Sequence, residues 1–335
     1  MSRWTAALVL LVGACASASS PTVRWPLQPA LQAYPFALTG TPVPLDASDP
    51  ARMRAGALAY AGGLVLSAER GTSRFGGLSG MDVGPNGQLV AVTDSGDLVR
   101  FALRLDGSGR LVGVADADIR PLRNTDGGPL QGKEEADAEG LVVAPDGGLL
   151  VTFERTHRAL AYADPAATPS PAPAPPAAGL PENAGWEGLA VLADGTRLFA
   201  AETGRLWSCR AARCDETRLE QDFGAEFQPT GLDGAPEGGA GAPAYATFRA
   251  FDPLRGMRAV VARLDPASDG RAWRATELAR LAPPLTADNF ESVVALPSPA
   301  VTGGVRLYVL SDDNFSDDQR TLLLAFDYAP GEARR

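Results

Sequence analysis

Two apolar runs joined by a turn signal make up residues 139–154, EGLVVAPDGGLLVTFE. The turn Pro145-Asp146-Gly147 between two strand-length runs predicts a β-hairpin. Three further segments repeat the pattern and a weaker copy follows it, so that the copies start at residues 79, 139, 187, 230 and 291. Repeats of several strands at such intervals are typical of β-propeller blades. We therefore predict an all-β fold, a β-propeller with five or six blades around a central channel.

The segments around the hairpins refine this prediction. No long amphipathic helical pattern separates the copies, which disfavours an α/β fold, whereas a β-sandwich remains an alternative. Leu58–Ser67 is strand-like and precedes the first hairpin, so it is a candidate outer strand that closes the ring on the last blade. Residues 166–178 are almost entirely Ala and Pro, and since Pro lacks a backbone donor we expect a surface excursion there.

The N-terminal region predicts export. Residues 1–18 read as an export signal, with Arg3 before the apolar run Ala6–Val12, which is too short to span a bilayer. Val12-Gly13-Ala14-Cys15 resembles a bacterial lipobox that would lipidate Cys15, and Ala16-Ser17-Ala18 is an alternative signal-peptidase site. We expect residues 19–56 to form an Ala/Pro-rich tether and lead-in, and residues 57–330 to form the propeller domain.

Charge and location limit the partners. The chain has 40 acidic and 30 basic residues and a formal net charge of −10. This balance disfavours a nucleic-acid surface, which needs a basic stripe, and suits a protein that handles cations. We expect a monomer in the periplasm or at the outer membrane of a bacterium, with a small anionic substrate or ligand and membrane contact only through the N-terminal lipid.

The hairpin ends carry an unusual number of acids. The residue opening the first strand and the residue closing the second lie at the same end of an antiparallel hairpin. A carboxylate fills seven of the eight such places in the four clear copies: Asp94, Glu139, Glu154, Glu187, Glu202, Glu291 and Asp312, with Ser79 as the exception. In a propeller these residues would form two rings at one mouth of the channel. The competing interpretation is that each acid caps a strand end.

Crowded carboxylates call for a cation or for raised pKa values. Oxygen ligands in a flexible setting suit Ca²⁺, which takes about 6–8 of them, and Asp313 beside Asp312 adds a further candidate. A solvated acidic loop over residues 312–318 is the alternative for that segment. Zinc is disfavoured, since His157 is the only histidine and no thiolates accompany these acids.

The remaining cysteines and arginines suggest smaller features. Cys209 and Cys214 predict a disulfide at a hairpin tip in an oxidising compartment. Arg155 and Arg249 are candidates for binding a phosphate or carboxylate group, or for pairing with neighbouring acids. Ser79 is a weak candidate nucleophile because its surroundings are not a strand–helix elbow. No catalytic residue is assigned.

The motifs resemble a known family, the bacterial phytase-like proteins, also described as having the esterase-like activity of phytase. The matching stretches are Phe75–Met81, Glu139-Gly140-Leu141 with Phe153-Glu154-Arg155, Gly185–Leu189, and Asn289–Ser292 with Ser311–Phe315. The resemblance implies an exported propeller and hydrolysis of a phosphoric or carboxylic ester. The chain departs from the family pattern at Phe248-Arg249, where Glu-Arg is usual.

Two functions follow from these observations. The first is a Ca²⁺-dependent hydrolase acting on phosphoesters or other anionic esters. The second is a non-catalytic, ligand-binding propeller in which calcium is structural, because neither a nucleophile nor a base is evident.

Overall fold

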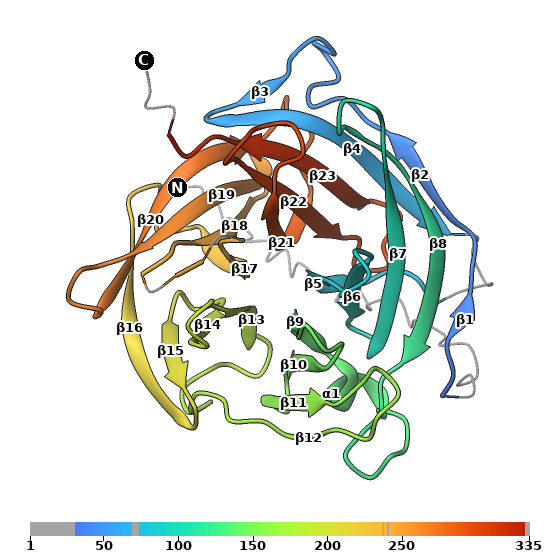
Figure 1. Cartoon of the computed structure of the whole chain (residues 1–335), viewed down its shortest axis with the longest axis vertical. Helices are drawn as coiled ribbons and strands as arrows, with labels where there is room; N and C mark the ends of the chain where they lie inside the picture. The colour runs from blue at the N-terminus through green and yellow to red at the C-terminus, as the bar shows by residue number, and fades with distance from the viewer. Residues whose placement is uncertain (1–30, 69–73, 237, 240, 332–335) are drawn as a thin grey trace, which may run out of the picture.

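The computed structural model describes residues 31–68, 74–236, 238–239 and 241–331. These residues are almost entirely β-strand, and the strands radiate from a central axis as the blades of a propeller (Figure 1). The predicted all-β propeller is therefore confirmed. Residues 1–18 and Cys15 lie outside the described residues, as does the first part of the expected tether.

Five blades are formed by the described residues. The first contains β5 (Leu78–Val83), β6 (Leu89–Thr93), β7 (Asp97–Leu105) and β8 (Leu111–Pro121), with β1 (Tyr34–Pro35) at its edge. The second contains β9 (Ala138–Val143), β10 (Leu149–Phe153), β11 (Arg158–Tyr162) and β12 (Ser170–Pro171). The third contains β13 (Trp186–Val191), β14 (Arg197–Ala201), β15 (Leu206–Arg210) and β16 (Arg213–Gln221). The fourth contains β17 (Gln228–Gly234), β18 (Ala244–Asp252), β19 (Gly256–Pro266) and β20 (Ala272–Leu281).

The fifth blade closes the ring with strands from both ends of the domain. It contains β21 (Asn289–Pro297), β22 (Val305–Asp312) and β23 (Thr321–Tyr328), followed by β4 (Leu58–Ala68) and β2 (Leu38–Pro42), while β3 (Arg54–Ala55) pairs with β4. The pairing of β4 with β23 confirms that the strand before the first hairpin closes the last blade. Part of the expected lead-in, residues 34–55, thus adds short strands to the outside of the propeller.

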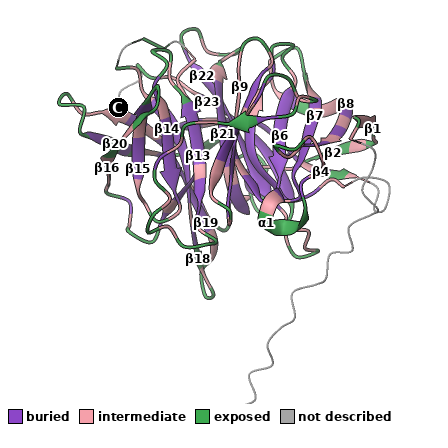
Figure 2. Ribbon diagram, turned by 90° about the horizontal axis from the view of Figure 1, so that it is seen from below, coloured by how far each residue is buried: buried purple, intermediate pink, exposed green. Residues whose placement is uncertain are grey.

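The first strands of the five blades, β5, β9, β13, β17 and β21, surround the axis in sequence order (Figure 1). Each contacts the next, and β21 contacts β5, so the ring closes after five blades. Apolar side chains fill the space between neighbouring blades; one cluster, for example, joins Leu141 and Phe153 of the second blade to Val92 of the first. Figure 2 shows this buried interior between exposed loops.

A bulge in each blade determines how close the first strands come to one another. In β13, β17 and β21 the register shift leaves one extra residue: Glu187, Thr230 and Glu291. In β5 and β9 two residues, Ser79-Gly80 and Glu139-Gly140, face a single residue of the second strand. The residue that directly follows Ser79, Glu139, Glu187, Thr230 or Glu291 is glycine in four blades and serine in the fifth. A Cβ on Gly231 would lie only 2.7 Å from Cα of Ser292 in the next blade. Small residues here therefore let the strands pack closely.

Hydrogen bonds also join neighbouring first strands. Asp82 Oδ2 accepts a hydrogen bond from the Val143 N–H of the second blade, with a length of 2.6 Å. In the same way Asp233 Oδ2 accepts one of 2.7 Å from the Ala295 N–H of the fifth blade. Burial raises the pKa of Asp82 to about 6, because the charged form loses its hydration.

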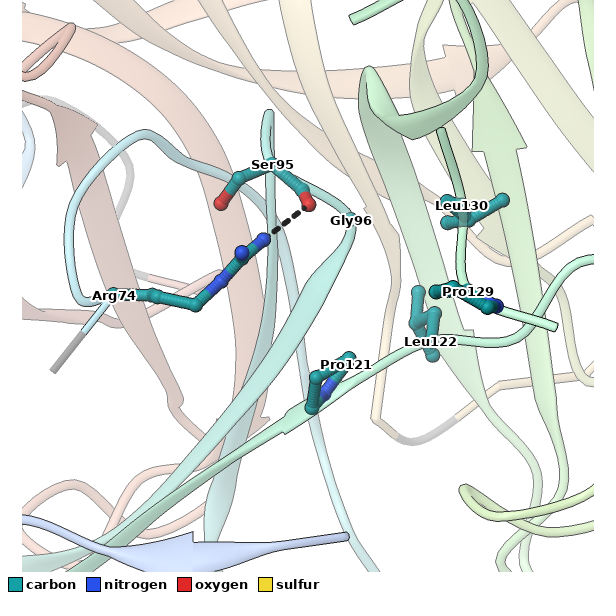
Figure 3. Close-up of a pocket in the computed structure, with 7 residues that line it drawn as sticks. All are labelled: Arg74, Ser95, Gly96, Pro121, Leu122, Pro129 and Leu130. Atoms are coloured by element: carbon teal, nitrogen blue, oxygen red, sulfur yellow. Dashed lines mark hydrogen bonds between the residues drawn. The ribbon is translucent and has the colours of Figure 1, made fainter. Parts of the chain in front are cut away.

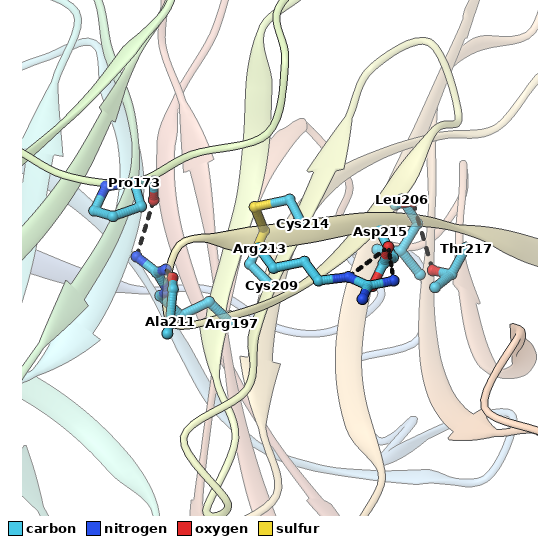
Figure 4. The surroundings of a disulfide bond; sticks show 9 residues. All are labelled: Pro173, Arg197, Leu206, Cys209, Ala211, Arg213, Cys214, Asp215 and Thr217. Carbon is cyan, nitrogen blue, oxygen red and sulfur yellow. Dashed lines mark hydrogen bonds and ion pairs between the residues drawn. A yellow bond between two sulfur atoms is a disulfide. The ribbon is translucent and has the colours of Figure 1, made fainter.

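Two outer features complete the fold. The outer strands β16 and β20 of the third and fourth blades pair in parallel. Cys209 and Cys214 are joined by a disulfide across the β15–β16 hairpin (Figure 4). The Ala/Pro segment, expected as a surface excursion, supplies β12 at the outer edge of the second blade, where Pro is tolerated. The described residues include no helix long and apolar enough to cross a membrane.

Candidate metal centre

The bulged residues and the residues after the second strands meet at one mouth of the channel. The hairpin register puts both groups at the same end of every blade: Ser79 and Asp94, Glu139 and Glu154, Glu187 and Glu202, Thr230 and Arg249, Glu291 and Asp312. These residues are close enough for their charges to interact: the charge of Glu187 helps to raise the pKa of Glu139, and the charge of Glu291 helps to raise the pKa of Glu187. The acids expected to gather at the mouth are therefore neighbours, and only the fourth blade contributes none.

Three carboxylates form a compact group within this ring. Asp94 of the first blade and Asp137 and Glu139 of the second each offer one oxygen, and these oxygens lie within 4.8 Å of one another. Asp137 Oδ1 is buried and accepts no hydrogen bond, although the Lys133 Nζ lies 3.3 Å away. A buried carboxylate oxygen that receives no hydrogen bond, beside two further carboxylates, is a donor set that suits a hard divalent cation, which would compete with the Lys133 ammonium.

Lys133 is one of two cations that the chain itself supplies to this group, the other being Arg155. Lys133 lies on the short helix α1 (Gly132–Ala136), and its Nζ donates a 3.2 Å hydrogen bond to Asp94 Oδ2. Its side chain is 48% exposed, whereas that of Asp137 is only 1% exposed. Burial lowers the pKa of Lys133, but the charges of Asp94 and Asp137 outweigh burial and raise it above its ordinary value. Lys133 is thus a charged, accessible partner for buried acids.

Asp137 lies outside the repeated spacing of acids in the sequence. It precedes the bulged Glu139 by two residues, and the fifth blade has the polar Asn289 at the matching place before Glu291. The first and third blades have Gly77 and Gly185 there, so no repeated pattern was visible. The stretch Asp137-Ala138-Glu139 was the available signal, because alternate residues of a strand point to the same side.

Burial and mutual repulsion keep several of these acids protonated at higher pH than usual. Burial, followed by the charge of Glu187, raises the pKa of Glu139 well above its ordinary value. Burial, followed by the charge of Glu291, does the same for Glu187. Burial and the Asp137 charge raise the pKa of Glu154 to about 8, and burial raises that of Glu291 to about 7. A bound cation would reverse these shifts by favouring the charged forms.

The fourth blade contributes an arginine to the other side of the mouth. The Arg249 guanidinium donates hydrogen bonds to Glu202 of the third blade and to Glu291 and Asn289 of the fifth. Of the two outcomes expected for Arg249, the structure gives the pairing with neighbouring acids. Glu202 and Glu291 therefore have a cation from the protein chain itself.

Arg155 also pairs with an acid. Its Nε donates a 2.7 Å hydrogen bond to Asp137 Oδ2, so it helps to position this buried carboxylate. The backbone N–H of Arg155 bonds the Glu182 carbonyl. Both candidate substrate-binding arginines are thus committed to groups of the protein in this structure.

Asp312 and Asp313, in the acidic loop after β22, have different surroundings. Asp312 is buried, and burial followed by the charge of Asp94 raises its pKa well above the ordinary value. Asp313 instead accepts hydrogen bonds of 3.0 Å from the Gly77 N–H, the Phe315 N–H and the Thr321 hydroxyl. The loop is therefore tied to the first blade through Asp313, while Asp312 faces the ring.

A serine triad is not assembled. The Ser79 hydroxyl donates to Asp94 Oδ1 over 3.1 Å, whereas His157 Nε2 lies 2.9 Å from the Pro181 carbonyl oxygen.

A hollow of about 20 Å³ near Arg74 and Ser95 has room for about one water molecule (Figure 3). Arg74 donates to the buried Asp97 there over 2.6 Å.

These features define the class: a five-bladed propeller whose mouth holds a group of carboxylates able to bind a cation. The chain belongs to the phytase-like family, described by the esterase-like activity of phytase, whose model matches residues 73–315. This match confirms the resemblance seen in the sequence motifs. No curated protein matches the chain in sequence.

Three solved structures are similar to the chain at low identity. A putative gluconolactonase has 17% identity and a TM-score of 0.44, with 89% of this chain and 92% of that chain covered. Virginiamycin B lyase from Staphylococcus aureus, in an inactive form with quinupristin, has 8% identity and a TM-score of 0.40, with 83% and 81% covered. A PQQ-bound aldose sugar dehydrogenase from Streptomyces coelicolor has 13% identity and a TM-score of 0.40, with 80% and 98% covered. Similarity at this level implies no shared reaction.

Proposed function

We propose that this protein is a calcium-dependent hydrolase of phosphoesters or other anionic esters. The observation that carries the proposal is the group formed by Asp94, Asp137 and Glu139, whose oxygens lie within 4.8 Å of one another. Its all-oxygen chemistry favours Ca²⁺, and water molecules would complete the coordination. The family description supports an ester as the substrate.

The proposed mechanism gives each residue a limited role. A cation held by the three carboxylates would polarise an ester oxygen and acidify a water molecule. Arg155 holds Asp137 in place through the 2.7 Å hydrogen bond between Nε and Oδ2. Glu154 lies beside this group, and in the absence of a cation burial and the Asp137 charge raise its pKa.

Asp137→Asn provides the test. The full chain would be assayed on p-nitrophenyl phosphate, p-nitrophenyl acetate and sugar phosphates, with calcium and with a chelator. We expect turnover of at least one ester only with calcium, and a loss of about tenfold or more in calcium affinity for the variant. Asp106→Asn, in an exposed turn, is the matched control. Turnover that ignores the chelator, or no turnover of any ester, would contradict the proposal.

One observation favours structural calcium as the second candidate function. Asp94 belongs to the first blade and Asp137 and Glu139 to the second, so an ion bound between them would join two blades. A non-catalytic binding propeller would then melt at a lower temperature in chelator and turn over no ester. The turnover assay separates the two candidates, because both share the ion.

We further propose that the protein is exported and reaches the periplasm or the outer membrane, as a monomer with Cys15 as its lipid attachment site. The Cys209–Cys214 disulfide is consistent with an oxidising compartment. Mass spectrometry of the protein purified from cells would test this. A mature chain that begins at Cys15 with an added lipid mass is expected, and an uncleaved N-terminus would contradict export.

A further inference from the structure

A second cavity, of about 440 Å³, opens beside the acidic mouth over the third, fourth and fifth blades. It shares Glu202, Arg249 and Asn289 with the ring and extends outward to the β18–β19 hairpin. Its size is within the usual range of about 300–1,000 Å³ for small-molecule sites. The cavity is distinct from the group of Asp94, Asp137 and Glu139, which does not line it.

Carboxamides dominate the polar part of the wall. Gln228 comes from the fourth blade, and Asn314 and Gln319 come from the fifth. Asn289 also lines the wall, but it is buried and its amide is bonded to Arg249 and Glu291. Asn314 Nδ2 donates to Gln319 Oε1 over 2.8 Å, so these two amides are fixed against each other. A carboxamide both donates and accepts hydrogen bonds, as a hydroxyl group does. The wall therefore matches a ligand that carries several hydroxyl groups.

An exposed aromatic ring provides the apolar part of the wall. Phe251 is 67% exposed although it is large and apolar, and it lines the cavity with Met257. In Figure 2 the tip of the hairpin between β18 and β19 projects beyond the blades. An exposed aromatic ring at the wall of a cavity can pack against an apolar face of a ligand, and a flat ring suits the C–H face of a sugar.

The charges of the wall exclude a polyanion. Glu202 and Glu226 contribute carboxylates. The cation Arg249 is bonded to Glu202 and Glu291, and Arg258 lies 3.3 Å from Glu226. Among the described residues that line the cavity, Arg249 is the only arginine or lysine, and its guanidinium is already bonded to Glu202 and Glu291. An uncharged ligand avoids repulsion by these acids.

We propose that this cavity binds the uncharged, hydroxyl-rich part of a ligand, namely one or two rings of a neutral sugar. The inference deepens the proposed function, because the sugar would be the alcohol part of the ester whose anionic group reaches the cation. Sugar binding itself requires no hydrolysis and can be measured directly.

Binding of maltose, cellobiose, lactose and trehalose to the full chain tests the proposal, by saturation-transfer NMR and calorimetry in calcium. We expect at least one disaccharide to bind, and Phe251→Ala to weaken its affinity about threefold to tenfold. Leu254→Ala is the matched control, since Leu254 is 97% exposed nearby and does not line the cavity. Both variants change exposed residues and should fold normally.

Three results would overturn the proposal: no disaccharide binds, Phe251→Ala binds as well as the wild type, or inositol hexakisphosphate displaces the disaccharide.

The sugar-binding and ester-turnover measurements together separate this inference from the proposed hydrolase. Sugar binding that depends on Phe251 without any ester turnover would contradict the hydrolase alone. Calcium-dependent turnover without sugar binding would contradict the cavity assignment alone.

Discussion

Arg249 of the fourth blade is structurally equivalent to Glu154 of the second. Arg249 directly follows Phe248, which pairs with Pro229 just before the bulge, and Glu154 directly follows Phe153, which pairs with Ala138 in the same way. A ring of acids thus contains one arginine, which bonds Glu202 and Glu291 from the blades on either side. The mouth is therefore divided. On one side Arg249 bonds two acids, and on the other Lys133 and Arg155 pair with Asp94 and Asp137, where a divalent cation would compete with the Lys133 ammonium.

Arg249→Gln should destabilise the propeller. The change leaves Glu202 and Glu291 without their cation, and we expect a loss of about 3 kcal/mol in the free energy of unfolding. Urea unfolding in chelator would measure it. Arg210→Gln breaks the ion pair with Asp194, in which the arginine is 73% exposed, and should cost less than about 1 kcal/mol. Equal losses in both variants would show that Arg249 has no special role.

Lys133→Met should strengthen calcium binding. The Lys133 ammonium lies 3.2 Å from Asp94 and 3.3 Å from Asp137, where it competes with a divalent cation for the same oxygens. We expect affinity to rise about threefold to tenfold, measured by calorimetry. Arg104→Met removes one charge from an exposed position and serves as the control. Weaker calcium binding by Lys133→Met would mean that the lysine supports the site.

Asp82 should make stability fall as pH rises. Its pKa is raised by burial from the ordinary 3.8 to about 6, so the folded protein holds a proton that the unfolded chain releases first. The stability from this group is full below about pH 4 and is lost as pH rises through about 6. Asp82→Asn cannot titrate there.

Chemical unfolding in chelator at several pH values would follow the difference between wild type and Asp82→Asn. The wild type should lose stability relative to the variant across this interval. Asp106→Asn is the control, because hydrogen bonds from Ser108 and Arg110 lower the pKa of Asp106 in its exposed turn. A constant difference between wild type and Asp82→Asn would contradict the shifted pKa.

Gly231→Ala should disturb the packing around the axis. The added Cβ would lie 2.7 Å from Ser292 Cα and 2.8 Å from the Glu291 carbonyl oxygen, both backbone atoms of the next blade. We expect a loss of about 1–3 kcal/mol in the free energy of unfolding. Gly107→Ala meets no atom within 4 Å and is the control. An unchanged Tm for Gly231→Ala would contradict the prediction, because it would mean that the two first strands can move apart with no loss in the free energy of unfolding.

The hairpins were predictable because their signals are local. Turn residues between apolar runs indicate which strands pair, and the pairing in turn predicts that Glu139 and Glu154 lie at one end of their blade. The closing strand was predictable from Leu58–Ser67 for the same reason. The sequence predicts five or six blades and does not choose between them, because ring closure depends on contact between β21 and β5, which are far apart in sequence.

The site was predictable only in part. The repeated spacing predicts that Asp94 and Glu139 belong to the site. It does not predict Asp137, because the equivalent positions of the first and third blades are glycines. The partners of Lys133 and Arg249 come from other segments of the chain, so no spacing pattern could reveal them. Pairing was one of two outcomes expected for Arg249, and the structure was needed to choose between them.

By itself, the sequence determined the strand pairing and the end of each blade at which the acids lie, because both depend on neighbours along the chain. The tertiary structure decided which acids meet a lysine or an arginine and which form the group around Asp137. Those distances arise only when the ring closes and brings separate blades together. Electrostatic energy depends on distance and burial, so the folded arrangement alone decides which carboxylates are left for a cation.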